Sequence, residues 1–157
     1  MNSNDILRRI RFVFDFNDSI MMKLMSTKEQ KVTRSEISDY LKKDDDPAQK
    51  KLSDTQLAVF LNHLIEEKRV KRECEKPAIE KRLTNNMVFM KLKIALNLKA
   101  EDVLEILSLA GFKLGKHELS AFFRKPFNKH YRECKDHVLS NFLQGLQIKY
   151  RPDVASP

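Results

Sequence analysis

The stretch DTQLAVFLNHL, residues 54–64, returns 82 positions later as DHVLSNFLQGL, residues 136–146. Both copies repeat apolar residues at steps of three and four, which is the spacing of one face of an α-helix. Shifting the chain by the same 82 positions aligns residues 4–69 with 86–151 without a gap and gives twelve identical pairs. Other apolar positions also match in kind. The sequence therefore predicts a helical unit that occurs twice.

Each half is predicted to contain about four helices separated by polar caps. Thr33 and Glu36 have the spacing of a capping box at the start of the third helix. Gly111 is expected to end the second helix of the second half, because glycine tolerates the left-handed conformation found there. The order of a helix, a short helix, a turn, a helix and a longer helix resembles lambda-repressor-like helix-turn-helix domains.

The predicted fold is all-α, with two tandem repeats of a four-helix, helix-turn-helix-like (lambda-repressor-like) bundle. We expect the first repeat over residues 1–69, a linker over 70–85, the second repeat over 86–151 and a disordered tail over 152–157. The chain has only 3 glycines and 5 prolines in 157 residues, which suits helices better than a β-sandwich or barrel. No apolar run reaches the length of a membrane span and no signal-peptide pattern is present, so a cytoplasmic location is expected.

The charge of the chain is positive and unevenly distributed. Lys and Arg number 30 against 22 Asp and Glu, for a net charge of +8, which favours an acidic partner. The net charge is +1 over residues 1–69, +2 over 70–85 and +5 over 86–157. Three aspartates at 44–46 occupy the positions of the uncharged residues 126–128, and this acidic triplet should repel a phosphate backbone. The second repeat is therefore predicted to be the better nucleic-acid binder.

Basic and polar residues around the third helix are the candidates for nucleic-acid contact, since the start of that helix would face a groove and nearby cations would bind phosphates. Those in the second repeat are Lys91, Lys93, Lys116, His117, Ser120, Arg124, Lys125, Lys129, Tyr131 and Arg132. Those in the first repeat are Arg8, Arg9, Arg11, Arg34 and Lys43.

Two interpretations of the segment from Arg124 to Asp136 stay open. Its single tyrosine among cations would grip a phosphate or stack on a base. Alternatively, Arg124 or Arg132 pairs with Glu133 or Asp136 and locks the third helix to the fourth. For all of the candidate cations the simple alternative is that Lys and Arg occupy the solvated face of a helix.

Metal binding is considered for His130, Cys134 and His137, whose spacing would place them on one helical face. The first repeat has Leu52 at the position of Cys134, which favours a packing role for the thiol. No metal and no cofactor are therefore expected.

Catalysis has little support in the sequence, which contains neither a Gly-rich phosphate loop nor a nucleophile elbow. Glu36 and Glu118 are repeated carboxylates that would suit a paired acid and base, although the distance from Thr33 favours helix capping. We therefore predict a protein that is not an enzyme and that binds nucleic acid. The alternative is a protein–protein adapter that uses the cleft between the repeats.

Several stretches carry a family resemblance: SNDILR at 3–8, residues 60–62, 64–65 and 67–69, NN at 85–86, KLKIA at 91–95, FRKP at 123–126, NKHYRECKD at 128–136 and residues 139–146. They resemble the YehS-like family of small bacterial proteins of unknown function, whose members carry this domain twice. The resemblance covers nearly the whole chain. It implies a bacterial cytosolic protein of two similar helical domains, and it implies no catalytic residue.

Overall fold

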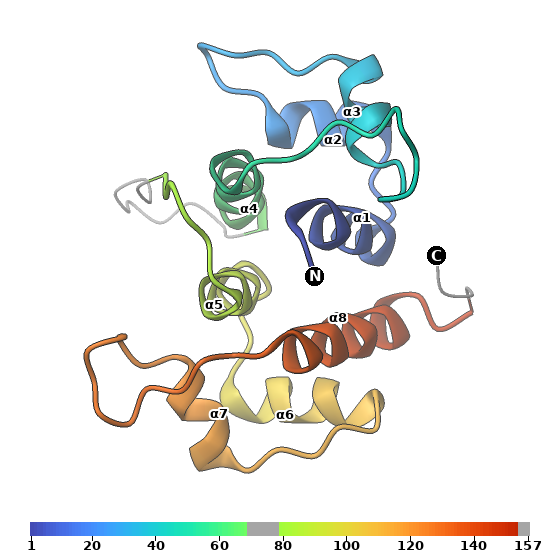
Figure 1. Cartoon of the computed structure of the whole chain (residues 1–157). Coiled ribbons are helices and arrows are strands. Elements are labelled where there is room, and N and C mark those ends of the chain that lie inside the picture. The colour runs from blue at the N-terminus through green and yellow to red at the C-terminus, as the bar shows by residue number, and fades with distance from the viewer. Residues whose placement is uncertain (69–78, 154–157) are drawn as a thin grey trace. The chain divides into compact units, whose positions relative to one another are not determined.

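The computed structural model describes residues 1–68 and 79–153, and within them every regular element is an α-helix. The helices of the first repeat are α1 (Ser3–Phe14), α2 (Asp18–Met25), α3 (Arg34–Tyr40) and α4 (Asp54–Lys68) (Figure 1). Those of the second are α5 (Asn85–Ala95), α6 (Ala100–Leu109), α7 (Lys116–Phe122) and α8 (Asp136–Tyr150). The prediction of an all-helical chain is confirmed. None of these eight helices is long and apolar enough to cross a membrane.

The chain divides into two compact units, with the boundary between Leu83 and Thr84. Thr84 caps α5, while the N–H of Leu83 donates to a carboxylate oxygen of Asp54 at 2.9 Å. The end of the predicted linker, residues 70–85, is therefore divided between the two units, and its part before residue 79 lies outside the described residues. The predicted tail, residues 152–157, lies outside them from residue 154 onward.

The last helix of each repeat supplies more buried apolar residues than any other helix of that repeat. The second helix of each repeat packs against it, α2 on α4 and α6 on α8. The shared apolar positions are each at most 1% exposed: Leu57, Phe60, Leu61 and Leu64 in α4, and Leu139, Phe142, Leu143 and Leu146 in α8. Burying one such side chain contributes about 1.5–3 kcal/mol to stability. The four shared residues of α4 therefore stabilise the first unit, and those of α8 stabilise the second.

Local signals at the helix ends act as the sequence predicts. The Thr33 hydroxyl accepts the N–H of Glu36 at 3.1 Å, and the Glu36 carboxylate accepts the N–H of Thr33 at 3.1 Å. Gly115 has no side chain at the same position, so only the bond from its N–H to the Glu118 carboxylate remains, at 3.3 Å. Both glutamates are thus helix-capping groups. Gly111 follows α6 with a φ of 78°, which confirms the predicted helix stop.

The packing of the second helix on the fourth differs between the repeats. His63 on α4 places its ring Nδ1 2.7 Å from the carbonyl oxygen of Leu24 on α2. The equivalent residue in α8 is Gly145, where an added Cβ would lie 2.0 Å from the carbonyl oxygen of Ile106 on α6. The backbones of α6 and α8 therefore touch where a histidine side chain fills the space between α2 and α4.

The connection before the third helix is longer than the turn of a helix-turn-helix motif. Residues 26–33 join α2 to α3, and residues 110–115 join α6 to α7. A helix-turn-helix turn has about three to four residues. The order of the helices agrees with the prediction, whereas these connections exceed the length of a tight turn.

Candidate nucleic-acid interface

A buried asparagine fastens the segment between the third and fourth helices in the first repeat. Asn4 lies on α1, and its amide nitrogen donates to the carbonyl oxygens of Tyr40 at 3.0 Å and Lys50 at 2.8 Å. Its amide oxygen accepts the N–H of Leu52 at 3.0 Å. One side chain thus satisfies backbone groups at both ends of the segment, which we call the first loop (residues 41–53).

Asn86 repeats this arrangement on α5 in the second repeat. Its amide nitrogen donates to the carbonyl oxygens of Phe122 at 3.0 Å and Arg132 at 2.8 Å, and its amide oxygen accepts the N–H of Cys134 at 2.9 Å. Every partner lies 82 positions after its counterpart. We call the two arrangements the asparagine clamps, and the segment held by Asn86 the second loop (residues 123–135).

The second loop contains two consecutive turns. The N–H of Asn128 donates to the Lys125 carbonyl, and the N–H of Tyr131 donates to the Asn128 carbonyl, both at 2.9 Å. The Asn128 side-chain oxygen also accepts the N–H of His130 at 2.8 Å, which is the bond of an Asx turn. The first loop has the same three bonds 82 positions earlier. The two loops therefore share one backbone scaffold.

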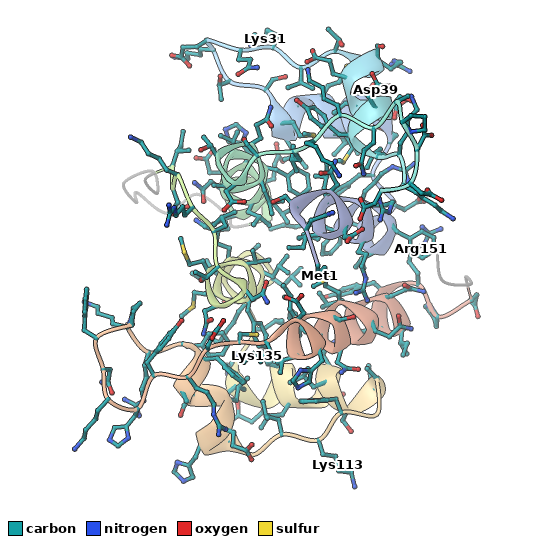
Figure 2. The ribbon with its side chains drawn as sticks, viewed as in Figure 1. Met1, Lys31, Asp39, Lys113, Lys135 and Arg151 are labelled. Carbon is teal, nitrogen blue, oxygen red and sulfur yellow. The ribbon has the colours of Figure 1, made fainter. Side chains whose placement is uncertain are left out.

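Three of the five exposed cations of the second loop have no ion pair within the described residues. Arg124, Lys125 and Lys129 are exposed, and no ion pair within the described residues involves them. The loop extends away from the helices of its own unit (Figure 1). Figure 2 shows side chains that point outward from the part of the chain that leads to Lys135. These three residues, all predicted from the sequence, form the strongest part of the candidate interface.

Arg132 is an exposed cation with an acidic neighbour. Its guanidinium lies 3.9 Å from the carboxylate of Glu118 on α7, and the equivalent pair in the first repeat is Lys50 with Glu36 at 2.8 Å. The predicted pairing of this arginine with Glu133 or Asp136 is therefore wrong, because the loop directs its side chain toward α7. Exposed pairs of this kind are weak, typically below about 1 kcal/mol, so Arg132 remains available to another anion.

The residues predicted at the start of α7 are all exposed. Lys116 lies 3.5 Å from the carboxylate of Glu101, with both side chains about 70% exposed. His117 and Ser120 face solvent, although the Ser120 hydroxyl donates to the His117 carbonyl at 2.8 Å. These three residues remain candidates for phosphate contact.

Three other candidates, Lys91, Lys93 and Tyr131, are less accessible to a ligand because they are buried, half-buried or packed against a ring. Lys93 holds its ammonium 5.5 Å from the centre of the Phe123 ring, and Tyr131 is half-buried. Lys91 is only 8% exposed. Its side chain therefore offers little surface to a phosphate, and burial argues against the predicted contact of Lys91.

The arginines of α1 are engaged or partly buried rather than free on the surface. Arg8 donates to the carbonyl oxygen of Lys42 at 3.0 Å and pairs with Asp5. Arg9 and Arg11 are half-buried, and burial lowers the pKa of Arg9. Arg8 thus holds the first loop through a hydrogen bond to its backbone, and the sequence does not reveal this structural role.

Two further candidates of the first repeat lie on its surface. Arg34 is exposed 3.8 Å from the carboxylate of Asp18, and Lys43 is exposed at the position equivalent to Lys125. Lys43 is followed by the acidic triplet, whose first member, Asp44, accepts hydrogen bonds from Gln49 at 2.8 Å and from Asn2 at 2.9 Å.

These bonds, the one from Gln49 first, lower the pKa of Asp44 and keep its negative charge beside Lys43. The negative charge of Asp44 therefore offsets the positive charge of Lys43 at the surface of the first loop.

The three residues considered as metal ligands, His130, Cys134 and His137, do not share a helical face. His130 and Cys134 both precede α8, which begins at Asp136, and His130 is exposed in the second loop. Cys134 is 1% exposed, and burial raises the pKa of its thiol to about 12. Leu52 is buried at the equivalent position, so the predicted packing role of Cys134 is confirmed.

One exposed residue of the second loop is absent from the predicted site. Phe127 lies at the middle of the turn from Lys125 to Asn128 and is 98% exposed. Its position in the sequence indicates only an uncharged residue in place of an aspartate of the first repeat. Phenylalanine is most often buried, so nothing in a single sequence predicts this exposure.

The comparisons with known proteins agree with the duplication. The family described as "Protein of unknown function (DUF1456)" matches residues 3–69 and again residues 85–151. The "Uncharacterized protein YehS" of Escherichia coli (strain K12) is 39% identical over 151 residues, which is 95% of this chain and 96% of that protein. No solved structure matches the chain.

Proposed function

We propose that this chain, which belongs to the DUF1456 family, is a non-enzymatic protein that binds nucleic acid through its second repeat. The observation that carries the proposal is the second loop, where Arg124, Lys125 and Lys129 are exposed on a backbone fixed by the Asn86 clamp. Binding would release counterions from the phosphates that these cations neutralise, and this release is the main source of sequence-independent affinity.

The third helix of the second repeat extends this surface. Lys116, His117 and Ser120 are exposed on α7, and Arg132 of the second loop pairs only weakly with Glu118 of the same helix. We infer a helix-turn-helix-like arrangement of α6 and α7 in which these residues contact phosphates. The long connection between the two helices argues against the close docking in a groove that a tight turn permits.

The chemistry of the remaining candidates supports binding rather than catalysis. Glu36 and Glu118 act as helix caps, and the Cys134 thiol stays protonated at neutral pH because burial raises its pKa to about 12. A protonated thiol is a poor nucleophile. The repeated carboxylates and the cysteine therefore have structural explanations.

The test is a titration of the full chain with labelled oligonucleotides at two salt concentrations. Arg124, Lys125 and Lys129 are replaced by glutamate in one variant, and the exposed Lys28, Lys31 and Lys51 of the first repeat in a control with the same change of charge.

The wild-type affinity should fall steeply with salt, by about 0.7–0.9 in log–log slope for each phosphate contact. We expect the loop variant to lose at least about tenfold in affinity and to have a flatter slope, while the control changes little.

The same titration distinguishes nucleic-acid binding from the second predicted function. That function is a protein–protein adapter working in the cleft between the repeats. Wild-type protein that fails to bind at low salt, or binds with no salt dependence, would contradict nucleic-acid binding and favour the adapter. Equal losses in the loop variant and its control would show that net charge, rather than the second loop, governs binding.

A further inference from the structure

We propose that the target is single-stranded nucleic acid and that Phe127 stacks on one of its unpaired bases. This inference rests on the proposed function, because it names the kind of nucleic acid that the second loop accepts. Its starting point is the 98% exposure of Phe127. The other nine phenylalanines of the chain are buried or half-buried, so this ring is exceptional within its own protein.

The structure holds the base of the second loop firmly. Phe123, at its start, packs edge-on against Phe89 with ring centres 5.0 Å apart. Near its end, the N–H of Arg132 donates to the Ala121 carbonyl at 3.1 Å, and Asn86 holds the backbone on both sides. Phe127 therefore projects from a loop whose ends are fixed, which lowers the entropic cost of presenting the ring to a ligand.

The chemistry of the ring and its neighbours narrows the class of ligand. A phenyl ring has no hydrogen-bonding atom, so its partner must offer an apolar surface or the face of another ring. Arg124, Lys125 and Lys129 flank it and attract a polyanion. Single-stranded nucleic acid combines both features, since aromatic side chains stack on its bases while cations follow its phosphates.

Double-stranded nucleic acid offers phosphates to the three cations but no exposed base face on which Phe127 can stack. The faces of its bases are covered by their neighbours, and inserting an apolar side chain requires unstacking at a cost of a few kcal/mol per step. A single-stranded target removes this cost. The first loop provides an internal contrast, because the same place in its turn is Asp45, which neither stacks on a base nor attracts a phosphate.

The experiment uses four substitutions of Phe127 in the full chain. The chain contains no tryptophan, so Phe127→Trp introduces a single fluorophore at the ring position. Its emission should be quenched by oligo(dT) and change little with a duplex of the same length. Phe127→Ala should weaken oligo(dT) binding by about tenfold with an unchanged salt slope, since stacking contributes without neutralising a phosphate.

Tyrosine and leucine separate stacking from simple apolar contact. Phe127→Tyr should bind oligo(dT) nearly as well as wild type, whereas Phe127→Leu should be as weak as Phe127→Ala. Leucine that restores binding would overturn the proposal. Because the ring is 98% exposed, all four variants should keep the helical circular dichroism of wild type.

The remaining outcomes distinguish this inference from the function on which it rests. If the wild type binds single strands and duplexes equally and Phe127→Ala has no effect, the stacking proposal fails while nucleic-acid binding stands. If the wild type binds neither, both fail. A blue shift of Phe127→Trp with phosphatidylserine vesicles, without quenching by oligo(dT), would overturn stacking in favour of a membrane surface.

Discussion

The first loop and the second loop share one backbone but present different chemistry to solvent. Each is fixed by a buried asparagine and bent by the same pair of turns. The first carries three aspartates in its turn and ties one of them to Asn2 and Gln49. The second carries an exposed phenylalanine near three cations that have no ion pair in the described part of the chain. The comparison shows that the repeated contacts hold the loop in place, while the residues at its tip are free to acquire a separate role.

The largest effect should come from breaking the asparagine clamps, which are the feature the repeats share most fully. Asn86→Ala leaves two carbonyl groups and one N–H without their partner, and we expect a loss of about 3–5 kcal/mol in the stability of the second unit. Asn4→Ala should cost the first unit a similar amount. Native-state hydrogen exchange of α1–α4 and α5–α8 measures the two losses separately.

Asn141→Ala is a control for the clamps. Its amide donates to the carbonyl oxygen of His137 one helical turn earlier, so its removal should cost less than about 1 kcal/mol. If Asn86→Ala is as mild as this control, water replaces the clamp and the shared scaffold is not what fixes the loops.

A smaller effect should arise where the repeats differ in helix packing. Gly145→Ala would push a methyl group into the carbonyl of Ile106, so α6 and α8 must separate at a cost of about 1–3 kcal/mol. His63→Ala should destabilise the first unit instead, through loss of the bond to Leu24 and of packing. Urea denaturation followed by hydrogen exchange tests both changes, and an unaffected second unit in Gly145→Ala would show that α6 and α8 do not touch.

The smallest change restores a contact that only the first repeat has. Gly115→Thr places a hydroxyl where Thr33 caps α3, and the backbone at Gly115 has a φ of −77° that threonine readily adopts. We expect a gain of about 0.5 kcal/mol in the second unit, measured from its thermal midpoint. Gly115→Ala separates capping from loss of glycine flexibility, since alanine supplies only the second effect. Equal midpoints for the two variants would contradict the capping argument.

The fold could be predicted from the sequence because its signals are local. Apolar residues at helical spacing, the pair of Thr33 and Glu36, and the stop at Gly111 each act within a few residues. The asparagine clamps could not be predicted in the same way. Asn4 and Asn86 are an identical pair in the sequence, but their partners lie 36–48 residues away, so their role depends on tertiary structure.

The candidate site was predictable in its charge and less so in its exposure. Arg124, Lys125 and Lys129 are found from their clustering in one basic segment. Lys91 and Arg8 look equivalent to them in sequence, although one is buried and the other holds the first loop. The prominence of Phe127 depends on the path of the loop, which an apolar residue in a single sequence does not disclose.

Cys134 is buried where the Asn86 clamp holds its backbone, and this burial has a practical consequence. Its N–H donates to the Asn86 side chain, the residue is 1% exposed, and its thiol is protonated at neutral pH. An alkylating reagent therefore meets this sulfur only during the moments when the clamp opens. The rate at which the reagent modifies Cys134 therefore measures how often the second loop opens locally at this residue.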